Sequence, residues 1–254
     1  MEAIFESLKG KKVFITGSSR GIGKALALAF AQNGADIVVH GIKPAQAMDE
    51  TFEEVKKFGT NVIKVCGDLS DTQVPKKLFD EITEKLGGVD ILICNASLQI
   101  RKPWIDISDE EMQQQIQVNF ISTLKLIQFF EPNMEKNGWG RIITIGSTQQ
   151  SKPHPDMLVY SSTKDAVYNS VKSLALQLAR KNITVNNVAP GTIYTDRNTE
   201  VLKDPEYFKK VEDDIPIHRI GEPLDCVGAV LMLASNAGSY ITGENLYIDG
   251  GKFI

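Results

Sequence analysis

Long apolar runs and blocks of basic charge are both missing from this 254-residue sequence. No stretch approaches the roughly 20 apolar residues that a membrane-spanning helix needs, and residues 1–12 show no signal-peptide pattern. The net charge of −4 is accompanied by no basic stripe on any expected element, which argues against a nucleic-acid partner. We therefore expect a cytoplasmic protein without membrane attachment.

Cysteine is scarce, and linker-like composition is absent. Cys66, Cys94 and Cys226 are odd in number and widely spaced, which favours small core side chains in a reducing compartment over disulfides or a metal site. No Pro- or Ser-rich linker, charge block or internal repeat divides the chain. One large α/β domain over residues 1–254 is therefore the simplest expectation, with no metal.

Short apolar segments alternate with helical patterns along the whole chain. The expected strands lie at about 12–16, 35–39, 61–65, 89–93, 141–145, 183–188 and 244–248. The expected helices lie at about 24–33, 45–58, 74 onward, 108–130, 158–181 and 224–234. This alternation predicts an α/β fold: a Rossmann-type, doubly wound parallel sheet of about seven strands, with helices on both faces.

Tyr160 and Lys164 lie four residues apart on an expected helix, and Ser147 stands thirteen residues before that tyrosine, just past a strand. The i, i+4 spacing puts the two Cβ atoms about 5–6 Å apart, so we expect the ammonium group to lower the phenol pKa from its usual value of about 10. Tyr160 is then a candidate proton donor and acceptor, and Ser147 could hold a substrate oxygen beside it. An isolated Tyr-x-x-x-Lys pattern is more often a surface feature.

A glycine-rich segment, Thr16-Gly-Ser-Ser-Arg-Gly-Ile-Gly23, joins the first expected strand to the first helix. Backbone N–H groups at the start of a helix, together with the helix dipole, bind the pyrophosphate of a dinucleotide. The glycine spacing differs from the G-x-G-x-x-G pattern of the long-chain Rossmann enzymes.

These motifs together resemble the classical short-chain dehydrogenase/reductase family, over nearly the whole chain. The resemblance includes sugar-acid enzymes, such as gluconate 5-dehydrogenase and 2-deoxy-gluconate dehydrogenase, and 3-oxoacyl-acyl carrier protein reductases. It implies an NAD(P)-dependent enzyme that interconverts a secondary alcohol and a ketone. Tyr160 would be the general acid and base, Ser147 would orient the substrate oxygen, and Lys164 would also bind the nicotinamide ribose.

The resemblance also assigns a role to Asn119, which would hold a water that connects Lys164 to solvent protons. The alternative is an ordinary buried amide that packs between helices. A homotetramer, built as a dimer of dimers, is implied as well, with residues about 108–130 and 158–181 pairing between subunits and the last strand forming a second contact.

The implied cofactor site follows the ends of the strands. Asp68 would accept a hydrogen bond from the adenine amino group, while Ile193 and Thr195 would hold the nicotinamide carboxamide. Ser97 stands where the family usually has glycine. The full set of expected cofactor contacts is Gly17, Ser19, Arg20, Gly21, Ile22, Gly23, His40, Gly41, Lys43, Asp68, Leu69, Asn95, Ala96, Ser97, Tyr160, Lys164, Pro190, Gly191, Ile193 and Thr195.

The second strand indicates which cofactor is preferred. Gly41 occupies the place where NAD enzymes usually carry an acidic residue for the ribose 2′-hydroxyl. Without that carboxylate, Arg20, Lys43 and His40 could attract a 2′-phosphate. We therefore expect a preference for NADP(H), with NAD(H) possible. In the alternative, the two cations are solvated and His40 only caps the strand.

The substrate is less well defined by the sequence. Arg101, followed by Lys102, could meet a substrate carboxylate, and Gln149 and His154 could contact hydroxyls; all could equally be solvated loop residues. Residues about 192–217 suit a mobile lid.

The sequence leaves two alternatives to a sugar-acid enzyme and argues against a third. A 3-oxoacyl thioester is the closest alternative substrate, and a non-catalytic dinucleotide-binding protein is a remote one. The segment Ile145-Gly-Ser-Thr-Gln149 lacks the Gly-x-Ser-x-Gly elbow of a serine hydrolase.

Overall fold

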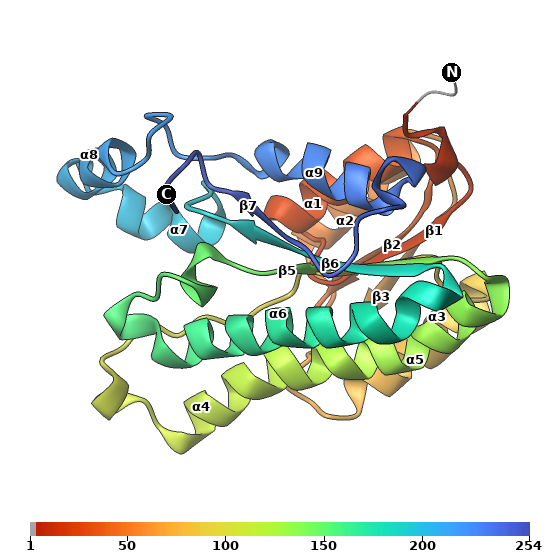
Figure 1. The fold of residues 1–254 in the computed structure, drawn as a ribbon, viewed down its shortest axis with the longest axis horizontal. Coiled ribbons are helices and arrows are strands. Elements are labelled where there is room, and N and C mark those ends of the chain that lie inside the picture. The colour runs from red at the N-terminus through yellow and green to blue at the C-terminus, as the bar shows by residue number, and fades with distance from the viewer. Residues whose placement is uncertain (1–3) are drawn as a thin grey trace.

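A computed structural model describes residues 4–254, without the side chains at 197, 200 and 201. Within this part of the chain, seven parallel strands form one sheet in the order β3-β2-β1-β4-β5-β6-β7 (Figure 1). The strands are β1 (Lys12–Ile15), β2 (Asp36–Gly41), β3 (Val62–Cys66), β4 (Ile91–Cys94), β5 (Gly140–Ile145), β6 (Ile183–Pro190) and β7 (Asn245–Ile248). The predicted doubly wound sheet is confirmed.

Helices cover both faces of the sheet (Figure 1). One face carries α1 (Gly21–Gln32), α2 (Gln46–Lys56) and α9 (Val227–Ala234), and the other carries α3 (Val74–Leu86), α5 (Ser122–Asn137) and α6 (Leu158–Leu178). In β1, Val13 and Ile15 join the first core while Phe14 joins the second, because successive strand residues point to opposite faces. Strands that are buried on both faces have continuous apolar sequences, and these apolar runs allowed the strands to be predicted.

The long helix before β5 differs from its expected form. Ser108 and Glu111 form the expected capping box at the start of α4 (Asp109–Ile116). A π-helical turn, Gln117–Ile121, then joins α4 to α5. We expected an end near Phe130, but α5 runs to Asn137 with Pro132 inside it. It ends at Gly138, whose φ of 62° allows the left-handed C-cap.

Two short helices, α7 (Asp196–Leu202) and α8 (Pro205–Asp213), form most of the segment expected to be a lid. Both lie beyond the carboxyl ends of the central strands (Figure 1). Leu202, Val211 and Ile215 pack with Ile220 in a small cluster separate from the two sheet cores. The segment therefore has a core of its own. Across residues 4–254, no helix is both long and apolar enough to traverse a bilayer.

Candidate active site

The loop between β1 and α1 forms a backbone cradle. Gly17 and Gly21 have φ values of 64° and 56°, in the left-handed region that favours glycine. A Cβ atom at Gly23 would lie 2.4 Å from the carbonyl oxygen of Gly17, so no larger residue fits there. Arg20 precedes α1 in an extended conformation and its side chain does not cap the helix. The first N–H groups of α1 thus face outward, which fits a pyrophosphate.

The end of β4 holds this loop in place. The side-chain amide of Asn95 donates to the carbonyl oxygens of Thr16 and Gly17 at 2.9 and 3.1 Å. The Thr16 hydroxyl accepts from the backbone N–H groups of Asn95 and Ala96, each at 2.9 Å. Ser97 follows directly and is half-buried. Asn95 therefore shapes the cradle in addition to any contact with a cofactor.

His40 corrects one of the expectations from the sequence. Its side chain is buried, and Nδ1 accepts from the backbone N–H of Gly17 at 3.0 Å, while Nε2 lies 3.1 Å from the carbonyl oxygen of Gly67. These partners require a neutral ring with its proton on Nε2. Burial lowers the pKa of His40 from 6.5 to about 4. The ring therefore contributes no positive charge toward a 2′-phosphate, and His40 instead joins the strand to the glycine loop.

The other residues expected near the adenosine ribose are exposed or small. A Cβ atom at Gly41 would lie 3.1 Å from the sulfur of Met48, so an acidic side chain would be crowded there. Lys43 is exposed in the turn after β2. Arg20 is exposed and its Nη1 lies 3.3 Å from Oδ2 of Asp196, at the start of α7. Strand β2 thus ends without a carboxylate of its own, Lys43 follows it, and Arg20 is paired with Asp196.

Two further residues expected to contact the cofactor lie just after β3. Asp68 is exposed, and one of its carboxylate oxygens accepts from the backbone N–H of Ser70 at 2.9 Å. Leu69 is buried in the core beneath α3. Asp68 therefore keeps its second oxygen for a partner outside this turn, while the Leu69 side chain packs inward.

Ser147, Tyr160 and Lys164 are all buried near the carboxyl end of β5. Their exposed fractions are 8%, 5% and 4%, and the 3₁₀ turn that follows Ser147 packs against α6. The Lys164 ammonium donates to the carbonyl oxygen of Ile145 at 2.6 Å and lies 5.7 Å from the centre of the Tyr160 ring. The sequence spacing thus corresponds to one buried cluster.

Asn119 lies in the π-helical turn, with its side chain buried. Its amide accepts from the N–H of Leu98 and donates to the carbonyl oxygen of the same residue, both at 2.8 Å. It also donates to the hydroxyl of Thr163, the neighbour of Lys164, at 3.0 Å. Asn119 therefore connects α6 to the chain after β4. π-Helical turns occur frequently at functional sites.

The segment after β6 lies over the start of α1. Pro190 ends β6, and the Gly191 N–H donates to Ile248 on β7 at 2.9 Å. The Ile193 side chain is buried. The Thr195 methyl carbon lies 3.4 Å from where a Cβ atom of Gly21 would stand, so this segment and the glycine loop are neighbours.

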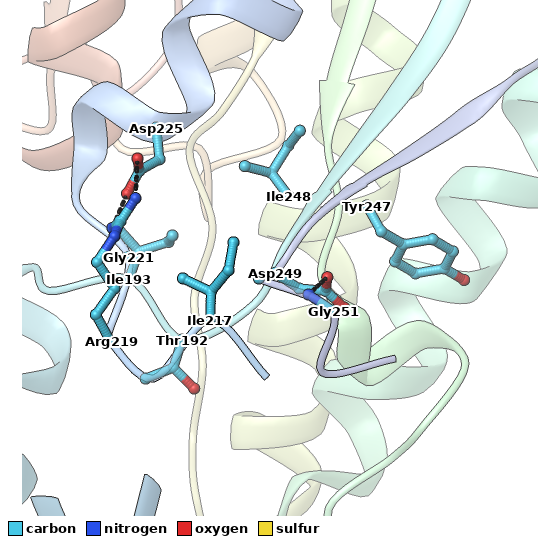
Figure 2. A pocket seen from close by; sticks show the side chains of 11 residues that line it. Thr192, Ile193, Ile217, Arg219, Gly221, Asp225, Tyr247, Ile248, Asp249 and Gly251 are labelled. Atoms are coloured by element: carbon cyan, nitrogen blue, oxygen red, sulfur yellow. Dashed lines mark hydrogen bonds and ion pairs between the residues drawn. The ribbon is translucent and has the colours of Figure 1, made fainter. Parts of the chain in front are cut away.

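A pocket of about 330 Å³ lies beside that segment (Figure 2). Arg219 and Asp225 form two hydrogen bonds of 2.7 Å at one side of it. The hydrogen bonds from the Arg219 guanidinium, and next the hydrogen bond from the Glu222 N–H, lower the pKa of Asp225 to about 2. Ser147, Tyr160 and Lys164 are not among the residues that line it: Thr192, Ile193, Ile217, Arg219, Gly221, Asp225, Tyr247, Ile248, Asp249, Gly250 and Gly251. The pocket therefore does not include the candidate catalytic residues.

The three candidate substrate residues come together from two parts of the chain. Arg101 Nη2 lies 3.0 Å from Nε2 of His154. The Gln149 side chain accepts from the backbone N–H of His154 at 2.6 Å, and the Gln149 N–H donates to the Ser147 hydroxyl at 3.2 Å. Lys102 is instead paired with Glu111, at the start of α4.

Two buried glutamines were not predicted from the sequence. Gln115 is fully buried and accepts from the N–H of Ile100 at 3.1 Å. Gln150 accepts from the N–H of Ser147 at 3.3 Å and from the Asn187 amide at 3.2 Å. Both hold loops that carry candidate residues. The only signal in the sequence is the paired or tripled glutamines in which they occur.

Comparisons with known proteins agree with this geometry. A family model described as "Enoyl-(Acyl carrier protein) reductase" matches residues 17–252. Glucose 1-dehydrogenase of Gluconobacter oxydans (strain 621H) is 39% identical over 246 residues, which cover 95% of this chain and 91% of that protein.

Two solved structures are also similar. The NADP-bound 3-oxoacyl (acyl-carrier-protein) reductase of Agrobacterium tumefaciens C58 is 36% identical, with a TM-score of 0.92 over 97% of this chain and 96% of that one. A candidate NAD(P)-dependent gluconate 5-dehydrogenase of Beutenbergia cavernae, with NADP at low occupancy, is 30% identical, with a TM-score of 0.92 over 97% and 98% of the two chains.

Proposed function

Because the chain belongs to the short-chain dehydrogenase/reductase family, we propose that it is an NADP(H)-preferring oxidoreductase that interconverts a secondary alcohol and a ketone. The observation that carries this proposal is the buried cluster of Ser147, Tyr160 and Lys164 at the carboxyl end of β5. Ligands of doubly wound sheets bind at this edge. The glycine cradle opens toward the same edge.

Each residue of the cluster has a defined part in the proposed reaction. A bound nicotinamide supplies or accepts the hydride at the carbinol carbon. In reduction, Tyr160 donates a proton to the developing alkoxide, and in oxidation its phenolate removes one. The Ser147 hydroxyl orients that oxygen. Lys164 places a positive charge beside the phenol ring and would bind the ribose.

Proton supply would pass through Asn119 in this proposal. Its side-chain amide already holds Leu98 and Thr163, so we propose that it acts first by positioning α6. A water next to the π-helical turn would then complete the route from Lys164 to solvent.

The cofactor preference is supported by charge. An acidic residue is missing at Gly41, and Arg20 and Lys43 are exposed at the same edge. A 2′-phosphate would form charge-assisted hydrogen bonds there. The similar reductase of Agrobacterium tumefaciens was solved with NADP. We propose further that the backbone of the cradle binds the pyrophosphate. Asp68 would bind the adenine amino group, and Ile193 and Thr195 would hold the nicotinamide carboxamide.

A sugar acid, or a related polyol or keto compound, is the proposed substrate. Residues about 192–217 would cover it as a lid, since α7 and α8 have a small core of their own. A 3-oxoacyl thioester is the second candidate, because one similar solved structure is a 3-oxoacyl (acyl-carrier-protein) reductase. A screen of NADPH oxidation with 5-ketogluconate, L-sorbose and acetoacetyl thioesters separates the two.

Tyr160→Phe tests the mechanism. We expect this variant to lose turnover by about 10²- to 10⁴-fold, because the proton donor is gone, while NADPH still binds. The same helix offers a matched control: Tyr168 also has a lysine four residues on, and the Lys172 ammonium lies 4.7 Å from its ring centre. Tyr168→Phe should keep normal turnover. Near-normal turnover by the Tyr160→Phe variant would exclude the assignment.

We also propose a homotetramer. Large apolar side chains are exposed along α4 to α6, among them Met112 at 37%, Leu158 at 48% and Leu176 at 85%. Exposed apolar residues on two long helices are consistent with pairing between subunits. Light scattering distinguishes a tetramer from a monomer.

A further inference from the structure

The imidazole of His154 faces a hydrogen-bond donor at each of its nitrogens. The backbone N–H of Asp156 donates to Nδ1 at 3.1 Å, and Nη2 of Arg101 lies 3.0 Å from Nε2. A neutral imidazole has one N–H and one lone pair. It therefore cannot accept from both partners, and one of the two contacts brings two donors together.

The backbone contact decides which nitrogen carries the proton. His154 caps the helical turn Pro155–Met157 through Nδ1, so the direction of the Asp156 N–H is fixed by the chain. Arg101 reaches Nε2 with a flexible side chain that is 37% exposed. With the Nδ1 lone pair in use, the proton lies on Nε2. The Nε2–H group and the Arg101 guanidinium then stand side by side as two donors, 3.0 Å apart.

Contacts from separate parts of the chain hold this pair in position. The Lys102 N–H donates to the carbonyl oxygen of Asp156 at 2.9 Å, which joins the arginine segment to the histidine turn. One carboxylate oxygen of Asp156 lies 3.7 Å from Nε of Arg101. Gln115, fully buried, binds the N–H of Ile100. Arg101 is thus anchored at its backbone and oriented at its head group.

We propose that Arg101 and the Nε2–H group of His154 together bind a carboxylate of the substrate, so that the enzyme acts on hydroxy acids and keto acids. This rests on the proposed function. Two converging donors, one of them cationic, match the oxygens of a carboxylate. An acceptor oxygen to which both groups turn would also relieve the donor–donor contact.

A short chain of hydrogen bonds connects this carboxylate site to the reaction centre. The Gln149 side chain binds the backbone N–H of His154, and the Gln149 N–H binds the Ser147 hydroxyl. Tyr160 follows four residues after Asp156 on the same segment. His154, one of the two proposed carboxylate donors, would therefore be held on the same stretch of chain as Ser147 and Tyr160, which would bind the reacting oxygen, and Arg101 would reach it from the loop after β4.

Calorimetry on the Tyr160→Phe protein loaded with NADP⁺ tests the proposal without turnover. The probes are two acids and the alcohols that replace their carboxylate: gluconate with glucitol, and 3-hydroxybutyrate with 1,3-butanediol. We expect the acid of at least one pair to bind about 10- to 100-fold more tightly than its alcohol. Asp156 already neutralises part of the Arg101 charge, which favours the lower end of that range.

Three variants in the same background identify the source of the preference. Arg101→Gln should abolish it. His154→Asn should reduce it severalfold, because an asparagine oxygen can still accept from the Asp156 N–H but offers no donor at the position of Nε2. Lys125→Gln makes the same charge change on an exposed part of α5 and should leave the preference intact.

Equal binding of acid and alcohol by the parent protein overturns the proposal. A preference that survives Arg101→Gln also overturns it, as does a variant that weakens acid and alcohol alike, since the arginine would then be structural. The proposed function fails by a different result, namely normal turnover by the Tyr160→Phe protein, so the two failures are distinguishable.

Discussion

Replacing His40 with asparagine should weaken the dependence of stability on pH between about 7 and 5. Burial lowers the folded-state pKa of His40 from 6.5 to about 4, whereas the unfolded chain binds the proton near the ordinary value. The contribution of neutral His40 to the free energy of unfolding is therefore fully present above pH 6.5 and is lost as the pH falls toward 4. The complete loss lowers the free energy of unfolding by about 3 kcal/mol, and the part already lost at pH 5 is about 2 kcal/mol.

Urea unfolding of the parent and the His40→Asn protein at both pH values measures this effect. The asparagine oxygen can accept from the Gly17 N–H, as Nδ1 of the histidine does, but it does not titrate. Carboxylates elsewhere titrate in both proteins and cancel in the comparison. At equal protein concentration, the parent should lose about 2 kcal/mol more than the variant between pH 7 and pH 5. Equal losses would refute the buried neutral imidazole.

Two further substitutions test the cradle and its support. Asn119→Ala leaves the N–H and C=O groups of Leu98 without their side-chain partner and should lower the free energy of unfolding by about 2–4 kcal/mol in urea; a loss below about 0.5 kcal/mol contradicts the positioning role. Arg20→Ser should raise KM for NADPH about 5- to 30-fold and leave KM for NADH nearly unchanged, because only NADPH carries the 2′-phosphate. A parent enzyme with the higher kcat/KM for NADH would reject the cofactor preference.

The fold was predictable from the sequence because burial on both faces makes strands such as β1, β4 and β5 short apolar runs. The end of α5 was not, since Pro132 suggests an earlier stop, yet the helix continues to Asn137. Tertiary packing decides this point: Phe130 and Met134, on either side of the proline, are both fully buried in the core. Helix propensity alone is a weak guide where such contacts are available.

The proposed catalytic tyrosine could not be chosen from its spacing alone, because α6 contains two Tyr-x-x-x-Lys pairs. Both lysines lie near their tyrosine rings, at 5.7 Å for Tyr160 and 4.7 Å for Tyr168. Ser147 was the feature that favoured Tyr160. The structure adds burial: Tyr160 is 5% exposed and Lys164 reaches the end of β5. Tyr168 belongs to the same helix but lies about two turns after Tyr160.

The least predictable feature is the set of side-chain amides that supports the site. Asn119 and Gln115 bind backbone groups 21 and 15 residues away in the sequence, and Gln150 binds the N–H of Ser147 within its own turn. A glutamine or asparagine in an apolar helical pattern indicates burial but not which backbone group it satisfies, since any N–H within reach would do.

The partners of the His40 side chain could not be predicted from the sequence either. At a strand end, a histidine can face either a phosphate or the core, and the sequence permits both. In the fold, the Gly17 N–H and the Gly67 carbonyl oxygen provide one donor and one acceptor, which only a neutral ring satisfies on both sides. In the proposed cofactor site, positive charge is therefore assigned to Arg20 and Lys43 and not to His40, which makes the kinetic effect of Arg20→Ser the sharper test of NADP(H) preference.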